Sequence, residues 1–128
     1  MQRHSDPSLR VFVVWEPMLP TDLRSPVHST LGRIPDQRAR QFWDPQHLVA
    51  QELRRIAGEN TGQPKPDCCV DRGFFWDDAI LYAPHSKWRQ TPAAVFWNGP
   101  VIRVVSALEK ALQNRTAASE SERHAGKR

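Results

Sequence analysis

Two adjacent cysteines, Cys68 and Cys69, are the residues of this sequence best suited to covalent or metal chemistry. They lie in a polar segment rich in proline, so we expect their thiols to be accessible. A vicinal pair can form a disulfide or chelate a soft ion such as Zn, Cu(I), Hg or As. The flanking carboxylates of Asp67 and Asp71 would disfavour the thiolate and reduce reactivity. The alternative is a pair of inert loop cysteines.

No metal and no cofactor is predicted. A structural zinc site lacks support, because neither a Cys-x-x-Cys motif nor a closely spaced histidine pair accompanies the two cysteines. The histidines His28, His47 and His85 are far apart in the sequence, and a surface position is expected for each.

Five tryptophans form the second feature of interest. Trp15, Trp43 and Trp97 each end a predicted strand, where an indole buries a large apolar area, so we expect packing roles. Trp76 and Trp88 bracket a predicted strand, and as an exposed pair they would indicate a peptide or partner surface.

The composition predicts one cytoplasmic domain. The chain has 128 residues, 39% hydrophobic and 25% charged. Its longest apolar runs, 11–15 and 93–97, are far shorter than the roughly 20 residues of a membrane span, and no secretory signal is visible. Two cysteines exclude a disulfide scaffold. The net charge is +4, but basic and acidic residues alternate along the body, so nucleic-acid binding is not predicted.

The sequence predicts one ordered domain between two disordered ends. We expect a disordered arm over 1–8 and a single domain over 9–115, with an irregular insertion at 59–75. The tail, 116–128, contains no large apolar residue and is expected to be disordered.

The first half of the domain predicts two strands and two helices. A β-branched and aromatic run predicts a strand at 10–15, buried on both faces. A short helix is expected at 27–33, with Ser25 as its N-cap and Pro26 at its first position. A second strand follows at 39–43. Asp44 and Pro45 then begin a helix that ends at Gly58, with one apolar face composed of Leu48, Val49, Leu53 and Ile56.

The second half predicts three strands and a helix. A strand is expected at 78–83. The pair Asn98-Gly99 between apolar runs predicts a hairpin of 93–97 with 101–105. Ser106 and Glu109 fit a capping box that begins a final helix, with Leu108 and Leu112 on its inner face. Strands that alternate with helices indicate an α/β protein with a partly parallel sheet covered on both faces.

The order of these features resembles the thioredoxin-like superfamily over residues 9–114. The resemblance depends on Thr91-Pro92, the strand AAVFW, Asn98-Gly99, a further strand and a closing helix. It implies a three-layer sandwich with a mixed central sheet. The family's Cys-x-x-Cys motif is missing, because Trp15–Pro20 occupies its place without a cysteine. Disulfide exchange is therefore excluded at this loop.

The resemblance also implies a ligand groove where the loop 16–22 meets Thr91-Pro92. Glu16 and Asp22 would act there as general base or polar anchors, and Thr21 would offer a hydroxyl. The groove candidates are Glu16, Pro17, Thr21, Asp22, His85, Trp88, Thr91 and Pro92.

Three functions compete. The first is a non-catalytic binding or accessory module for a protein or peptide partner. The second is thiol redox or soft-metal handling by Cys68-Cys69. The third is a structural protein that forms a homodimer through the edge of 93–105, since an exposed apolar edge strand needs a partner. We favour the first, so the protein is not expected to be an enzyme, and Cys68, Cys69 and Glu16 are its only candidate catalytic residues.

Overall fold

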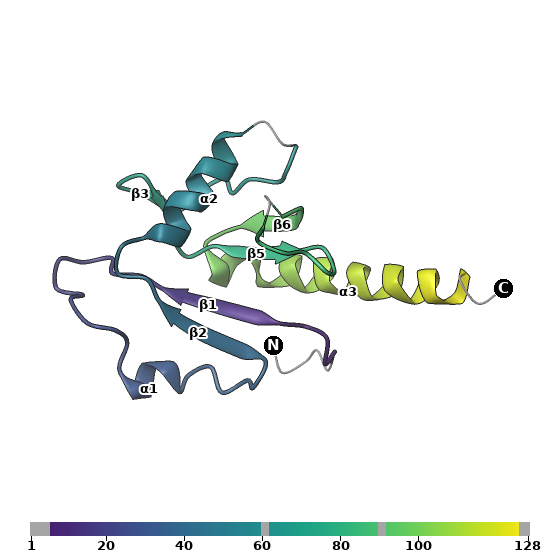
Figure 1. Ribbon diagram of the computed structural model, residues 1–128, viewed down its shortest axis with the longest axis horizontal. Helices are drawn as coiled ribbons and strands as arrows, with labels where there is room; N and C mark the ends of the chain where they lie inside the picture. Colours follow the sequence, from purple (N-terminus) through teal and green to yellow (C-terminus); the bar gives the residue numbers. More distant parts are fainter. Residues whose placement is uncertain (1–5, 60–61, 90–91, 126–128) are drawn as a thin grey trace. The chain divides into compact units, whose positions relative to one another are not determined.

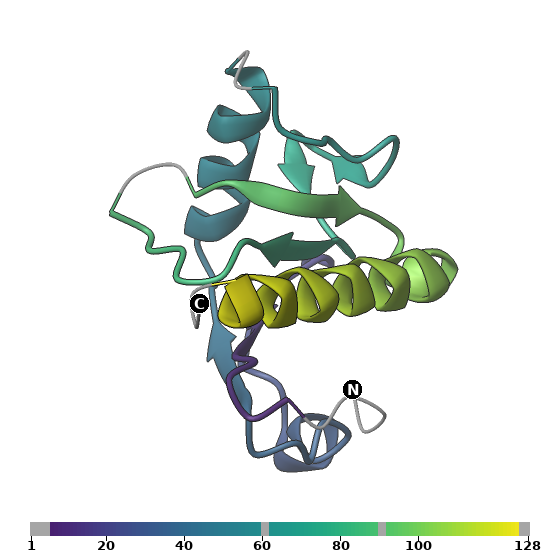
Figure 2. The ribbon, with the colours of Figure 1, turned by 90° about the vertical axis from the view of Figure 1, so that its right-hand side faces the viewer.

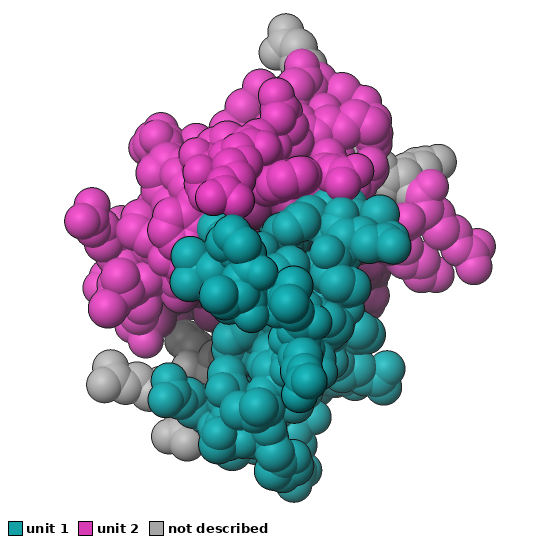
Figure 3. Space-filling model, turned by 90° about the vertical axis from the view of Figure 1, so that its left-hand side faces the viewer, with its two compact units in different colours: residues 1–49 teal, residues 50–128 magenta. Residues whose placement is uncertain are grey.

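The computed structural model describes residues 6–59, 62–89 and 92–125, with side chains to residue 115 (Figure 1). These residues form three helices and six strands, so the predicted α/β class is confirmed. The chain divides into two compact units, residues 1–49 and 50–128, coloured separately in Figure 3. The domain expected over 9–115 therefore spans both units.

A parallel strand pair forms the centre of the first unit. β1 (Val11–Trp15) pairs with β2 (Ala39–Trp43), from Val11 opposite Ala39 to Trp15 opposite Trp43. Both strands lie where the sequence predicts them. Parallel neighbours need a crossover connection, and here that connection contains the short helix α1 (His28–Leu31).

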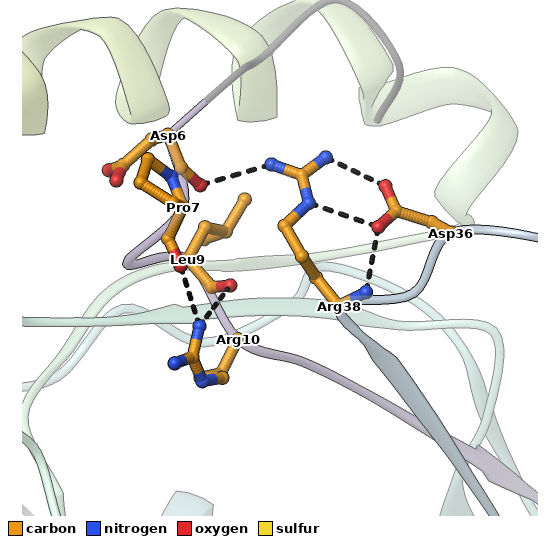
Figure 4. A network of polar contacts seen from close by, with 6 residues as sticks. All are labelled: Asp6, Pro7, Leu9, Arg10, Asp36 and Arg38. Carbon is orange, nitrogen blue, oxygen red and sulfur yellow. Dashed lines mark hydrogen bonds and ion pairs between the residues drawn. The ribbon is translucent and has the colours of Figure 1, made fainter.

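A hydrogen-bond network at the start of β2 binds the N-terminal segment (Figure 4). The Arg38 guanidinium donates to both carboxylate oxygens of Asp36, at 3.0 and 2.7 Å, and to the carbonyl oxygen of Asp6 at 3.1 Å. Arg10 donates to the carbonyl oxygen of Pro7 at 2.7 Å. Part of the arm expected to be disordered thus makes specific contacts, while residues 1–5 lie outside the described residues.

Two local predictions in the first unit are wrong. α1 has Val27 as its N-cap with no side-chain cap, so Ser25 does not cap it. β1 is not buried on both faces, because Phe12 is 63% exposed and Phe42 on β2 is 49% exposed. Their ring centroids lie 6.1 Å apart on the same exposed face. Continuous apolar runs do not distinguish a doubly covered strand from one that presents an apolar face to solvent.

Helix α2 (Leu48–Gly58) begins later than the sequence predicts, because residues 45–46 form a turn. Asp44 caps it as predicted, since its Oδ2 accepts a 2.8 Å hydrogen bond from the Val49 amide. Ala50, Leu53 and Ile56 are buried, whereas Leu48, predicted to lie on the apolar face, is 60% exposed.

The second unit is built on an antiparallel pair. β5 (Ala79–Tyr82) pairs with β6 (Ala94–Asn98), with Ile80 opposite Trp97. α3 (Val101–Ala125) packs against both strands (Figure 2). The buried side chains of these elements are Leu81, Ala94, Trp97 and Val104.

The segment 59–75, predicted as an irregular insertion, contains a short hairpin. β3 (Val70–Asp71) pairs with β4 (Phe74–Phe75). Gly73 in its turn has a φ of 87°, a left-handed conformation that suits glycine. Phe75 packs edge-on against Trp97, with ring centroids 5.3 Å apart.

The predicted hairpin around Asn98-Gly99 is wrong, because residues 101–105 begin α3 instead of a strand. β5 already pairs with β6, so β6 does not need the expected partner. The carbonyl oxygen of Asp77 accepts the Val101 amide at 2.9 Å, which satisfies one free donor at the helix start. The expected capping residues Ser106 and Glu109 consequently lie inside the helix.

α3 continues further than the sequence suggests. Its backbone is helical to Ala125, so residues 116–125 of the tail expected to be disordered belong to this helix. Residues 126–128 lie outside the described residues. The described strands pair as three two-stranded sheets, namely β1–β2, β3–β4 and β5–β6.

Candidate functional site

Cys68 and Cys69 are joined by a disulfide bond, and both are half-buried. The carbonyl oxygen of Cys69 accepts a 2.9 Å hydrogen bond from the Trp76 amide, next to the β3–β4 hairpin. Cys69 has a φ of 69°, in the left-handed region that non-glycine residues rarely adopt. The backbone of the disulfide is thus held by the neighbouring hairpin.

The junction between β6 and α3 supports the cysteine segment from another side. Asn98 Oδ1 accepts the amides of Asp67, at 3.4 Å, and Gly99, at 2.8 Å. A Cβ atom placed on Gly99 would lie 3.0 Å from Cys69 Sγ. Glycine at this position therefore lets the junction approach the disulfide closely.

An open cavity of about 580 Å³ lies beside the disulfide. Both cysteines line it, together with Val70 and Phe75 of the hairpin. The two cysteines therefore form part of the wall of an open cavity.

Two cations and one carboxylate share the cavity wall with the cysteines, namely Arg54, Lys65 and Asp67. Arg54, on α2, donates a 2.9 Å hydrogen bond from Nη1 to the carbonyl oxygen of Gly73, which holds its side chain against the hairpin turn. Nearby cations favour a thiolate. The sequence predicts an acidic setting from Asp67 and Asp71, and the cavity wall also contains the two cations.

A carboxylic acid that sequence reasoning missed, Asp78, lies close to Gly99, as Cys69 does. Asp78 Oδ2 accepts a 2.9 Å hydrogen bond from the indole Nε1 of Trp97. Burial raises the pKa of Asp78 to about 6, with a further increase from Asp77, while the indole hydrogen bond opposes the shift. The only sequence signal was an acid at the start of an apolar strand.

A second polar pair lies in the first unit, at the carboxyl ends of the parallel strands. His47 Nδ1 lies 3.3 Å from Glu16 Oε2, and both side chains are mostly buried. Glu16 follows β1 and His47 follows β2. Sequence reasoning proposed Glu16 as a candidate and expected His47 at the surface.

The loop 16–22 is organised by its own aspartate. Asp22 Oδ2 accepts the amides of Met18, at 3.0 Å, and Leu19, at 2.8 Å. Pro17 is half-buried and Thr21 is exposed. The carboxylate that sequence reasoning offered as a groove anchor therefore forms the turn of the loop.

The remaining groove candidates belong to the second unit. His85 and Trp88 are exposed, and Trp88 packs edge-on against Tyr82 with ring centroids 5.7 Å apart. Pro92 is buried, and Thr91 lies outside the described residues. The groove that would join these residues to loop 16–22 stays a prediction.

The tryptophans follow their predicted roles in part. Trp97 is 3% exposed, which confirms its packing role. Trp15 is half-buried and donates a 3.0 Å hydrogen bond from Nε1 to Gln41 Oε1, and Trp43 is also half-buried. Trp76 and Trp88 are exposed.

Comparison of the chain with protein-family models, curated proteins and solved structures finds no match. Within the described ranges, no three histidine, cysteine or acidic residues are grouped so that they could hold a metal ion. No described helix has both the length and the apolar character needed to cross a bilayer.

Proposed function

We propose that the protein takes part in thiol–disulfide exchange, with Cys68 and Cys69 as its redox pair. The observation that carries this proposal is the disulfide at the wall of an open cavity, next to Arg54 and Lys65. Its substrate is a thiol, either a small molecule or a cysteine of a partner chain.

The reaction transfers two electrons. One substrate thiolate attacks a sulfur of the Cys68–Cys69 bond, which forms a mixed disulfide and releases the other cysteine as a thiolate. A second substrate thiolate then attacks the mixed disulfide. Two substrate thiols become one substrate disulfide, and the protein gains two electrons and two protons as its two thiols. The reverse sequence oxidises the protein.

Soft-metal binding is the property of the reduced pair that competes with exchange. Two adjacent thiolates suit a soft ion, and the cavity leaves space beside them. We treat this as an outcome to be measured on the reduced protein, because the observed state of the pair is the disulfide.

The test is a redox titration. The protein is equilibrated in dithiothreitol and glutathione buffers of known potential, free thiols are alkylated, and the products are weighed by mass spectrometry. We expect one two-electron transition, in which the ratio of oxidised to reduced protein changes tenfold over about 30 mV. Cys68→Ser and Cys69→Ser are the controls and should lose it. Thiols that stay free at every potential would exclude the proposal.

We also propose a thioredoxin-like arrangement of the chain. The order β1–α1–β2 with parallel strands, then α2, then the antiparallel β5–β6 followed by α3, supports it. The strand pair that leads into the closing helix is β5–β6, in place of the pair expected over 93–105. The redox pair then lies outside the loop where that family carries its cysteines.

A binding module is the second candidate function. The exposed face of β1–β2, with Phe12 and Phe42, favours it, because exposed aromatic side chains are typical of partner surfaces. A cytoplasmic location and a homodimer also stay proposals. The dimer edge that was predicted needed a strand at 101–105, which is helical, so that edge is no longer proposed.

A further inference from the structure

We infer that Asp78 donates a proton to Cys69, and takes it back, during exchange at the Cys68–Cys69 pair. This inference rests on the proposed function, and it assigns different roles to the two sulfurs. Cys68 is the sulfur that forms the mixed disulfide with the substrate. Cys69 is the leaving and resolving sulfur, next to the acid.

The backbone of Gly99 brings the carboxyl group and the sulfur together. A Cβ atom placed on Gly99 would lie 2.5 Å from Asp78 Oδ1 and 3.0 Å from Cys69 Sγ. Both atoms therefore flank the same backbone position, and their separation is at most the sum of these two distances. Once the disulfide opens, the Cys69 side chain is free to rotate toward the carboxyl oxygen.

The two oxygens of Asp78 have different surroundings. Oδ2 is held by the Trp97 indole at 2.9 Å, which fixes the orientation of the carboxyl group. Oδ1, the oxygen near Cys69, is closed off from solvent and has no hydrogen-bond partner among the described residues. A buried polar atom without a partner is costly and calls for an explanation. In the reduced protein, a proton shared with the Cys69 thiol would give Oδ1 the partner that it lacks while the disulfide is closed.

The charges around Asp78 suit an acid that works near neutral pH. Burial keeps its pKa at about 6, and Asp77 is the neighbouring charge that adds to this shift. The groups set against it from other segments, Trp97, Gly99 and Cys69, carry no charge while the disulfide is closed. A general acid or base is most effective when its pKa lies near the working pH.

The proton balance follows from these positions. The substrate thiolate attacks Cys68 Sγ, the Cys68–Cys69 bond breaks, and its electron pair stays on Cys69 Sγ. Asp78 transfers its proton to this thiolate and becomes a carboxylate. In the reverse direction the Asp78 carboxylate removes the proton from Cys69, which attacks the mixed disulfide at Cys68 and expels the substrate thiolate.

The experiment measures the rate at which dithiothreitol reduces the full-length oxidised protein between pH 4.5 and 8.5, expressed per dithiothreitol thiolate. We expect this rate constant to increase about tenfold or more as the pH falls through the titration of Asp78. Asp78→Asn should give a flat profile. Asp77→Asn removes a neighbouring exposed carboxylate whose charge raises the pKa of Asp78, so it should keep the pH dependence, with the inflection at somewhat lower pH.

Trp97→Phe keeps the test decisive if Asp78→Asn does not fold. The indole hydrogen bond favours the ionised carboxylate, so its loss should move the inflection to higher pH. The inference is overturned if Asp78→Asn retains the pH profile of Asp77→Asn, or if Trp97→Phe leaves the inflection in place. A wild-type pair without a two-electron transition in redox buffers would instead exclude the proposed function itself.

Discussion

His47 Nδ1 lies 3.3 Å from Glu16 Oε2 and thereby joins the residues that follow the two parallel strands of the first unit. Strands that run in the same direction present their carboxyl ends at one edge, where α/β proteins commonly place polar ligands. His47 has a φ of 55°, so its backbone adopts a left-handed conformation at this contact. Parallel pairing of β1 and β2 therefore brings the two residues together, and His47 adopts a backbone conformation that is uncommon for residues other than glycine.

We predict that this pair stabilises the first unit. Glu16→Gln and His47→Gln should each lower the free energy of unfolding in urea, and a double-mutant cycle should give a coupling of about 0.5–1 kcal/mol. His28→Gln, at an exposed position in α1, is the control and should change stability little. A coupling energy of zero would show that the contact makes no contribution to the fold.

The sequence predicted those elements that depend on strong local patterns. β1, β2, β5 and the core of α2 were found because their apolar runs and the Asp44 cap act locally. The segment 101–105 was assigned wrongly because its β-branched residues favour a strand by local propensity, which the folded chain overrides. Val104, Leu108 and Leu112 also fit one helical face, and pairing of β6 with β5 decided between the two.

The site was predicted only in its most conspicuous part. Adjacent cysteines are visible in any sequence, but the approach of Asp78 to Cys69 depends on Gly99, whose backbone comes close only in the folded chain. His47 was missed for the same reason. Its neighbour Glu16 is distant in sequence, and only the parallel pairing of β1 with β2 brings them together.

The Asp36–Arg38 contact should make the first unit sensitive to acid. Hydrogen bonds from the Arg38 side chain and backbone lower the pKa of Asp36 from 3.8 to about 2. A lowered carboxyl pKa stabilises the fold at pH values above 3.8, and this contribution is lost as the pH falls toward about 2. Carboxyl titration by NMR should place Asp36 well below its ordinary value. In Arg38→Gln we expect it to return to that value, and an unchanged titration would refute the assignment.

The Asp78 carboxyl group should affect stability in the opposite sense. Its pKa is raised from 3.8 to about 6, so the folded state retains a proton that the unfolded state has already lost. Its contribution to stability is complete below pH 3.8 and is lost as the pH rises through about 6. Because Asp78 is only partly buried as a residue, screening by solvent should reduce this loss to about 1 kcal/mol. Urea unfolding across this range should show the loss in wild type and in Asp77→Asn, but not in Asp78→Asn. Equal slopes in all three would contradict the prediction.

Gly99→Ala should damage the fold and the redox site together. The added methyl group would lie 2.5 Å from Asp78 Oδ1, 2.7 Å from the Asp77 carbonyl oxygen and 3.0 Å from Cys69 Sγ. The Asp77 oxygen belongs to the backbone, and the Asp78 carboxyl group is held by the Trp97 indole, so neither can move away easily. Overpacking of this kind costs about 1–3 kcal/mol, and displacing Cys69 from Asp78 should also flatten the pH profile of reduction. Gly58→Ala is the matched control, because nothing lies within 4 Å of the position of its added methyl group at the end of α2. Both alanine variants could instead unfold at the same urea concentration and keep the wild-type reduction profile. That result would show that the junction of β6 and α3 does not position Cys69 close to Asp78.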